Sequence, residues 1–182
     1  GAVLKFDPTP QLYLPMVKTS WEGTFLQNHS PFIYGYNLHD VSIIGRGTID
    51  GNAASTFATW RKDQKRDLML SRKMNHEEIP VEQRNFGKDT KLRPHLIQFF
   101  NCRNITLSDF FITNSPFWCV HLLKSDNIIC RALRYDAKLV NNDGIDPESS
   151  RNILIEDVEF NNGDDNVAIK SGRDNDGWHC AT

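Results

Sequence analysis

The sequence predicts an all-β protein, a right-handed parallel β-helix in which short strands coil around an apolar core. Residues 1–51 consist of short apolar runs that end at glycine or proline, which is typical of strands rather than helices. Further along, the chain is periodic: Asn-Ile pairs begin at Asn104, Asn127 and Asn152, which are 23 and then 25 residues apart. A period in the low twenties, built of short strands and turns, is typical of a solenoid.

Apolar side chains recur at fixed offsets from these three asparagines, at one, three, six and eight residues beyond each of them. Steps of two place residues on one face of a strand, and the step of three marks a corner. A β-sandwich, the alternative fold, would not require such columns of like residues. The predicted columns are Ile105, Ile128 and Ile153; Leu107, Cys130 and Ile155; Phe110, Leu133 and Val158; and Ile112, Tyr135 and Phe160.

One segment, residues 52–92, departs from this pattern, because it is rich in charge and contains only one Ile and one Val. We interpret it as an insertion, helical over part of residues 60–74, on a single β-helix domain to which all of residues 1–182 belong. It forms either a surface loop or a wall beside a binding cleft, and we prefer the second. His76-Glu77-Glu78 begins like a zinc-protease motif, but Pro80 stands where the second histidine belongs, so no metal is expected.

Composition excludes several classes of protein. The net charge of −2 and the pI of about 6.3 argue against a nucleic-acid partner. No apolar run approaches the ~20 residues of a membrane span, so no membrane partner is expected. The cysteines lack the spacing of a zinc site or a disulfide framework and are expected to be buried thiols. They are Cys102, Cys119, Cys130 and Cys180.

Two acidic clusters stand out, one formed by Asp143 and Asp146 and one by Asp164 and Asp165. The repeat places Trp118, Asp143 and Asp165 at equivalent positions of successive coils, ~4.8 Å apart. Like charges so close are unfavourable and raise at least one pKa. A proton-holding acid beside ionised bases is what glycosidic bond cleavage needs. Asp164 and Asp165 converge only if the chain bends, for which Gly163 is suited.

Two structural alternatives compete with this interpretation of the acidic clusters. Asn and Asp cap their own backbone in tight turns, so the clusters are also compatible with Asx-turns. A calcium site is the other alternative, because Asp174-Asn175-Asp176-Gly177 resembles part of an EF-hand loop, although Gly172 would then occupy its first position.

Three further side chains are candidates for contact with substrate. Trp118 either faces a sugar ring or fills the core. Lys170 points opposite to Val167 and Ile169, which we place inside, and outside it would pair with the carboxylate of an acidic sugar. His121 also has the outward parity, which places it either near the cleft or on the surface.

Several short motifs follow one another along the chain in an order that, taken together, is specific for one protein family. Asn141-Asn142-Asp143-Gly144 matches a family pattern Asn-Thr-Asp-Gly, with Asn in place of Thr, and Gly163-Asp164-Asp165 matches a Gly-Asp-Asp motif without change. Other matches are Ile169 to Asp174, Ser20 to Gly23, Gly47 to Gly51, and Asn114-Ser115-Pro116 followed by Trp118 and His121. By these residues the chain resembles glycoside hydrolase family 28, the polygalacturonases, over nearly all its length outside residues 52–92.

The resemblance implies hydrolysis of an α-linked galacturonan or a related pectic chain, without a cofactor or a metal. Asp164 would be the general acid, and Asp143 and Asp165 would hold and activate the attacking water. Asn141, which opens the first motif, would bind substrate together with Trp118, His121 and Lys170. The implied reaction inverts the anomeric centre, with a carboxyl separation of ~6.5–9.5 Å that leaves room for water.

The family's Gly-His-Gly element and its Arg-x-Lys substrate clamp follow the Gly-Asp-Asp region, and this sequence ends at Thr182 without them. We therefore expect an incomplete β-helix, an internal piece of a longer secreted or periplasmic enzyme, that is inactive or nearly so alone. Alternatives are a rhamnogalacturonan hydrolase or another pectic glycosidase of the family, a pectate-lyase-like β-helix, and a non-catalytic carbohydrate-binding β-helix.

Overall fold

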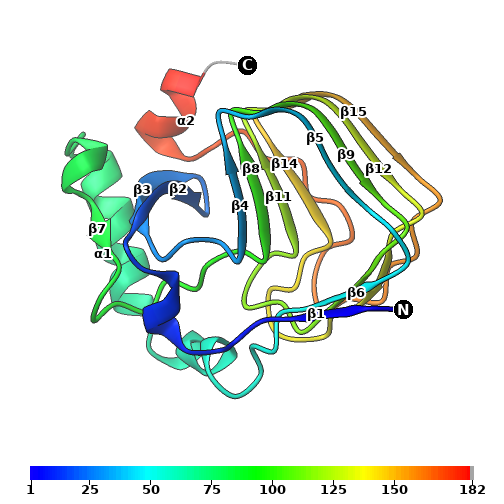
Figure 1. Ribbon diagram of the computed structural model, residues 1–182. Coiled ribbons are helices and arrows are strands. Elements are labelled where there is room, and N and C mark those ends of the chain that lie inside the picture. The colour runs from blue at the N-terminus through cyan, green and yellow to red at the C-terminus, as the bar shows by residue number, and fades with distance from the viewer. Residues whose placement is uncertain (181–182) are drawn as a thin grey trace.

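Three parallel sheets surround one apolar core in the computed structural model, which describes residues 1–180 (Figure 1). The predicted parallel β-helix is confirmed. The first sheet contains β1 (Val3–Lys5), β6 (Thr48–Asp50), β10 (Phe111–Thr113) and β13 (Arg134–Asp136). The second contains β4 (Ile33–Tyr36), β8 (Ile97–Phe100), β11 (Val120–Leu123) and β14 (Ile145–Glu148). The third contains β5 (His39–Ile44), β9 (Arg103–Ser108), β12 (Asp126–Arg131) and β15 (Arg151–Glu156).

The strand register reproduces the predicted columns of apolar residues. Each coil passes through the second, third and first sheets in that order, as from β8 to β9 to β10. Ile105, Ile128 and Ile153 are paired across three coils. Ile112 is likewise paired with Tyr135. The remaining predicted positions belong to the same core or pack against it, those of the last coil being half-buried: Leu107, Cys130, Ile155, Phe110, Leu133, Val158 and Phe160.

The recurring asparagines have a backbone reason. Asn104, Asn127 and Asn152 have φ values of 55°, 57° and 54°, a left-handed conformation that asparagine tolerates better than most residues. Their side chains form a ladder at the corner: Asn127 Nδ2 donates to Asn104 Oδ1 at 2.8 Å, and Asn104 Nδ2 donates to Asp40 Oδ1 at 2.7 Å. The Asn-Ile pair therefore marks a turn into the third sheet followed by the first buried residue of its strand.

Two long excursions leave the coil at the same corner, between the first and second sheets. The first, residues 6–32, contains η1 (Pro10–Tyr13) and the antiparallel hairpin of β2 (Val17–Trp21) and β3 (Thr24–Asn28). The second, residues 51–96, contains η2 (Phe57–Lys62), α1 (Lys65–His76), η3 (Val81–Gln83) and β7 (Asn85–Phe86), which pairs with β3. Figure 1 shows both excursions on the side of the second sheet. On the next two coils, the same corner takes only residues 114–119 and 137–144.

The β2–β3 hairpin covers the outer face of the second sheet. Thr19 Oγ1 donates to Gln98 Oε1 at 2.7 Å, and Ser20 Oγ contacts the carboxylate of Glu148 at 3.3 and 3.4 Å. His121 has the outward parity that the sequence predicts, but this cover leaves it fully buried. Its expected place at the surface or in the cleft is therefore wrong, because an outward-facing side chain is exposed only where nothing packs over the sheet.

The last coil ends in α2 (Asp174–Cys180), which is tied to β3 through Asp176 Oδ2, the acceptor of the Phe25 N–H at 2.8 Å. The expectation that Val167 and Ile169 lie inside is wrong, since 39% and 87% of their surfaces are exposed. They have the core-facing parity, but within residues 1–180 no further coil covers them.

The four cysteines are free thiols, three of them buried and Cys180 half-buried. Across residues 1–180, no helix has both the length and the apolar character needed to span a membrane.

Candidate active site

An open pocket of about 480 Å³ lies where the excursions meet the coil stack. Its floor comes from the short corner turns between the first and second sheets, and one wall comes from the tip of the β2–β3 hairpin. Five of the seven residues that the sequence predicts for the site line it, whereas Asp165 and His121 do not. The lining residues are Glu22, Gly23, Trp118, Asn141, Asp143, Asp164 and Ile169 to Arg173.

The three predicted carboxylates converge: one oxygen each of Asp143, Asp164 and Asp165 lies within 4.8 Å of the other two. Stacking of the coils brings Asp143 beside Asp165, because the Gly144 N–H donates to the Asp165 carbonyl at 2.9 Å. The same stacking places Trp118 one coil away, since the Cys119 N–H donates to the Asp143 carbonyl at 2.9 Å. The predicted equivalence of these positions is therefore observed in the backbone.

Asp164 and Asp165 are neighbours in sequence, and a tight bend turns both carboxylates to the same side. Asn162 Nδ2 holds the bend by donating to the carbonyls of Asp164 at 2.7 Å and Asp165 at 2.9 Å. The Asp165 N–H donates to Asp164 Oδ1 at 3.1 Å. A Cβ at Gly163 would approach the Leu139 carbonyl oxygen to 2.5 Å, so only glycine fits there without a shift.

These carboxylate oxygens are closer than the ~6.5–9.5 Å expected of an inverting acid and base. The close approach follows from the geometry of the fold, since neighbouring coils are separated by only ~4.8 Å. Three carboxylates at this spacing are also compatible with a cation, because oxygen atoms are the ligands of hard cations. The other calcium candidate is wrong: Asp174 to Gly177 lie in α2, where Asp176 is bound by Arg84 at 2.6 Å.

Burial separates the carboxylates chemically. Asp143 is only 4% exposed, whereas Asp164 and Asp165 are exposed. Burial raises the pKa of Asp143 to about 6, although the Lys170 ammonium, 3.8 Å from Asp143 Oδ2, opposes this rise. Asp143 therefore loses its proton near neutral pH rather than in acid, and the main cause is burial, with the neighbouring Asp164 that the sequence indicates contributing less.

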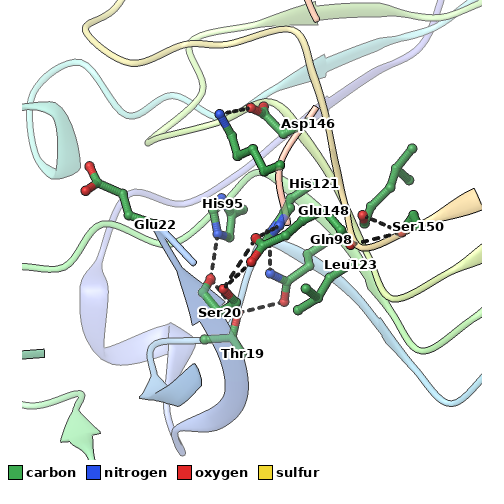
Figure 2. Close-up of polar contacts among 12 residues, drawn as sticks. Thr19, Ser20, Glu22, His95, Gln98, His121, Leu123, Asp146, Glu148 and Ser150 are labelled. Atoms are coloured by element: carbon green, nitrogen blue, oxygen red, sulfur yellow. Dashed lines mark hydrogen bonds and ion pairs between the residues drawn. The ribbon is translucent and has the colours of Figure 1, made fainter. Parts of the chain in front are cut away.

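The sequence analysis gives no role to a fourth carboxylate, Asp146 of the first acidic cluster, which is fully buried. Burial and the nearby Asp143 raise the pKa of Asp146 to about 9. Lys170 Nζ lies 3.0 Å from Asp146 Oδ1 (Figure 2). Two aspartates that share one proton beside one lysine have no net charge, and a cluster without net charge has the lowest free-energy cost of burial. Its place beside Asp143 in the first acidic cluster, and the outward parity that it shares with His121, were the available signals.

The Asp146 carboxyl is expected to make stability depend on pH. Folding raises the pKa of Asp146 from 3.8 to about 9, so the folded protein holds this proton more tightly than the unfolded chain does. The resulting stabilisation is fully present below pH 3.8 and is lost as the pH rises through about 9. The unfolding free energy of the Asp146→Asn variant should therefore rise relative to that of the wild type over this range. Urea unfolding at several pH values measures it. Asp157→Asn, at an exposed position, is the control, and equal pH dependence of wild type and Asp146→Asn would contradict the assignment.

Trp118 and Lys170 are engaged with the protein itself. Trp118 is 5% exposed and stacks on Phe117 with ring centroids 5.0 Å apart, so it fills the core and presents only a margin to the pocket. Lys170 Nζ lies 4.3 Å from the centroid of the Trp118 ring, a cation–π contact. With Asp146 on its other side, the ammonium is directed at protein groups.

His121 belongs to a buried polar network (Figure 2). Its ring centroid lies 5.2 Å from that of Trp118, in an edge-to-face contact. Its Nε2 lies 2.8 Å from Glu148 Oε2, and its Nδ1 lies 2.8 Å from Gln98 Nε2. Since no part of its ring is exposed, His121 supports the pocket and does not contact a substrate.

The tip of the β2–β3 hairpin contributes Glu22 and Gly23 to the pocket lining, two residues that are not among the candidates predicted from the sequence. Their φ values are positive, at 45° and 83°. Glu22 Oε2 accepts a hydrogen bond from Arg72 Nη2 at 2.9 Å, and its carbonyl accepts one from Arg173 Nε at 3.2 Å. Residues 52–92 do not line the pocket themselves. Instead, Arg72 of α1 supports the pocket wall through its contact with Glu22. The match of Ser20 to Gly23 to a family motif was the available signal.

The sequence of this chain is similar to those of known proteins. The model of the family described as "Glycosyl hydrolases family 28" matches residues 16–179. A Vitis vinifera protein named "Probable polygalacturonase" is 34% identical over 149 residues, which are 80% of this chain and 26% of that protein. An endo-polygalacturonase of Pectobacterium carotovorum subsp. carotovorum is 32% identical over 77% of this chain and 32% of its own length.

Solved structures agree in fold. The crystal structure of a hyperthermoactive exopolygalacturonase from Thermotoga maritima matches with a TM-score of 0.95 and 42% identity, covering 97% of this chain and 43% of that one. The polygalacturonase from Erwinia carotovora ssp. carotovora matches with a TM-score of 0.68 and 25% identity, over 93% of this chain and 42% of that one. This chain thus spans about a quarter to less than half of the relatives it matches.

Proposed function

Because this chain belongs to the glycosyl hydrolases of family 28, we propose that it carries the acid–base carboxylates of a hydrolase acting on pectic polysaccharide. The observation that carries the proposal is the convergence of Asp143, Asp164 and Asp165 within 4.8 Å beside an open pocket. Hydrolysis of a glycosidic bond needs one carboxyl to protonate the leaving oxygen and another to activate water.

The different surroundings of the carboxylates suggest their roles. Asp164 is exposed in the pocket, where it can reach the glycosidic oxygen and donate a proton to it. Asp143, whose pKa of about 6 makes it ionised at neutral pH, accepts a proton from water together with Asp165 on the neighbouring coil. The water thereby loses a proton as its oxygen attacks the anomeric carbon, and the leaving oxygen gains the proton of Asp164.

We propose a single displacement with inversion, although the carboxylates are close together. The stacking of the coils holds Asp143 and Asp165 near each other, and one oxygen of Asp164, the proposed acid, also lies within 4.8 Å of one oxygen of each. The proposal of inversion therefore rests on a water held by two carboxylates and not on the separation of acid and base. A water molecule that donates hydrogen bonds to both Asp143 and Asp165 would lie where a retaining enzyme has its nucleophilic carboxylate.

The proposed substrate is an α-linked galacturonan or an oligogalacturonide. Lys170 is already paired with Asp146, so we assign recognition of a sugar carboxylate to Arg173, a half-buried cation in the pocket lining. We also propose attack at the chain end, as in the Thermotoga maritima exopolygalacturonase, because the hairpin braced by α1 walls one side of the pocket. A polymeric substrate of this kind implies a secreted or periplasmic protein.

The test is analysis of products made by the complete gene product from polygalacturonate and from rhamnogalacturonan. We expect short saturated products from polygalacturonate at early times, the inverted anomer by NMR, and no change on chelation of calcium. Residues 1–182 alone are expected to be inactive. Unsaturated, ultraviolet-absorbing products that require calcium would show a lyase instead, and mixed oligomers at early times would contradict attack at the chain end.

A further inference from the structure

A fully buried cation, Arg93, reaches across the corner turns of three coils on the pocket side of the stack. It lies just before β8, is 0% exposed, and its guanidinium lies 4.8 Å from the centroid of the Phe117 ring. Its Nη1 donates to the Pro116 carbonyl at 3.3 Å and to the Val140 carbonyl at 2.8 Å. The side chain therefore joins residues 114–119 to residues 137–144, the turns that hold the candidate site.

No carboxylate pairs with this cation: among the described residues, no Asp or Glu oxygen lies within 4.0 Å of the guanidinium of Arg93. Burial lowers the pKa of Arg93 to about 10, so the group is still charged at neutral pH. Removing a charge from water is costly in free energy, and no carboxylate partner offsets that cost at Arg93. Stability alone is therefore a weak explanation for an arginine here.

The remaining contacts of Arg93 point toward the acid. Nη2 donates to Asn141 Oδ1 at 2.7 Å, and Asn141 Nδ2 donates to Asp164 Oδ2 at 3.3 Å. Arginine has only donors, so the amide oxygen of Asn141 must face Arg93. The NH₂ group must then face Asp164, and the alternative orientation of the amide, with its oxygen toward the carboxylate, is excluded by chemistry.

On the far side, Gln64 Oε1 accepts a hydrogen bond from Arg93 Nε at 2.9 Å. Gln64 is 3% exposed and lies in the excursion of residues 51–96, between η2 and α1. The planar guanidinium is thus held at each of its three nitrogens. Gln64 connects the excursion to Asp164 through Arg93 and Asn141.

We propose that Arg93 is a positioning residue for Asp164, which it orients by locking the side-chain amide of Asn141. The proposal rests on the proposed function of Asp164 as the acid. The locked N–H donor holds Oδ2, and the Asp165 N–H holds Oδ1, which orients the carboxyl toward the pocket. Each oxygen retains a second lone pair, so the carboxyl can still carry the proton that it donates.

The test is Arg93→Lys in the complete gene product, because lysine keeps the charge but has one nitrogen and cannot hold all these acceptors. We expect kcat on polygalacturonate to fall about 10- to 100-fold, with KM within threefold, because a misplaced acid slows the chemical step.

Arg84→Lys is the matched control, since Arg84 is a second buried arginine, bound to the Ile79 and Phe25 carbonyls and to Asp176. It should lose comparable stability while kcat of the folded protein stays unchanged. Unchanged kcat in Arg93→Lys, or equal changes of kcat in both variants, would overturn the proposal.

A second variant serves if Arg93→Lys fails to fold. Asn141→Asp keeps an acceptor for Arg93 but removes the donor to Asp164, so we expect it to fold and to lower kcat at least tenfold. Wild-type activity in this variant would overturn the proposal, whereas absence of turnover in the wild type would instead contradict the proposed function. A crystal structure of either folded variant gives an answer without turnover: the Asp164 carboxyl should turn, and an unmoved carboxyl counts against Arg93.

Discussion

Replacing Asp164 with asparagine in the complete gene product is expected to lower kcat on polygalacturonate by a factor of about 10²–10⁴. Asparagine has nearly the same shape but no acidic proton for the glycosidic oxygen. The side chain is exposed in the pocket, so neither the fold nor the affinity for substrate should change much. Steady-state kinetics of reducing-end release measure the effect on kcat, and binding of an oligogalacturonide by calorimetry measures affinity.

Asp157→Asn is the matched control, because Asp157 is an exposed aspartate on the same coil and does not line the pocket. It should leave kcat unchanged. Full activity in Asp164→Asn would exclude Asp164 as the acid. If both the wild type and the variant bind the oligogalacturonide without cleaving it, the β-helix is a binding module and not an enzyme.

Replacing Glu148 with alanine is expected to destabilise the protein by about 1–3 kcal/mol for each buried group that it leaves without a hydrogen-bond partner. Glu148 is 1% exposed, and its Oε2 lies 2.8 Å from His121 Nε2 under the hairpin (Figure 2). Its loss leaves the buried imidazole and the hydroxyl of Ser20 without their partner. Chemical denaturation followed by tryptophan fluorescence measures the change.

Glu156→Ala provides the comparison, because Glu156 forms an ion pair with Arg131 on neighbouring strands of the third sheet, where both side chains are partly exposed. Exposed pairs of this kind contribute about 0–1 kcal/mol. Equal losses of stability in the two variants would contradict this expectation. They would show that the buried contacts of Glu148 contribute no more to stability than the exposed ion pair of Glu156.

The two long excursions explain how a regular coil acquires an asymmetric pocket. Both leave the stack at one corner, and the following coils take that corner in the short turns that carry Asn141, Asp143 and Asp164. One excursion supplies the pocket wall at Glu22. The other supports that wall through Arg72 and connects to Asp164 through Gln64 and Arg93. The β-helix places the carboxylates, and the excursions determine which of them are buried.

The sequence by itself determined the coil and the meeting of the carboxylates. Apolar columns at fixed offsets follow from strand alternation and corner spacing, which are local properties of the chain. The equivalence of Trp118, Asp143 and Asp165 needed only the repeat length, because parallel coils stack in register. The bend at Gly163, which turns Asp164 to the same side, was likewise readable from a glycine beside two acidic residues.

Only the tertiary structure decided what covers the outer face of the second sheet. Ser20 and Glu148 are 128 residues apart in sequence, and no periodicity relates the hairpin to the strands beneath it. The burial of His121, the pairing of Lys170 with Asp146, and the route from Arg93 to Asp164 all depend on such contacts. Strand parity says which way a side chain points, but exposure and charge state depend on what packs against it.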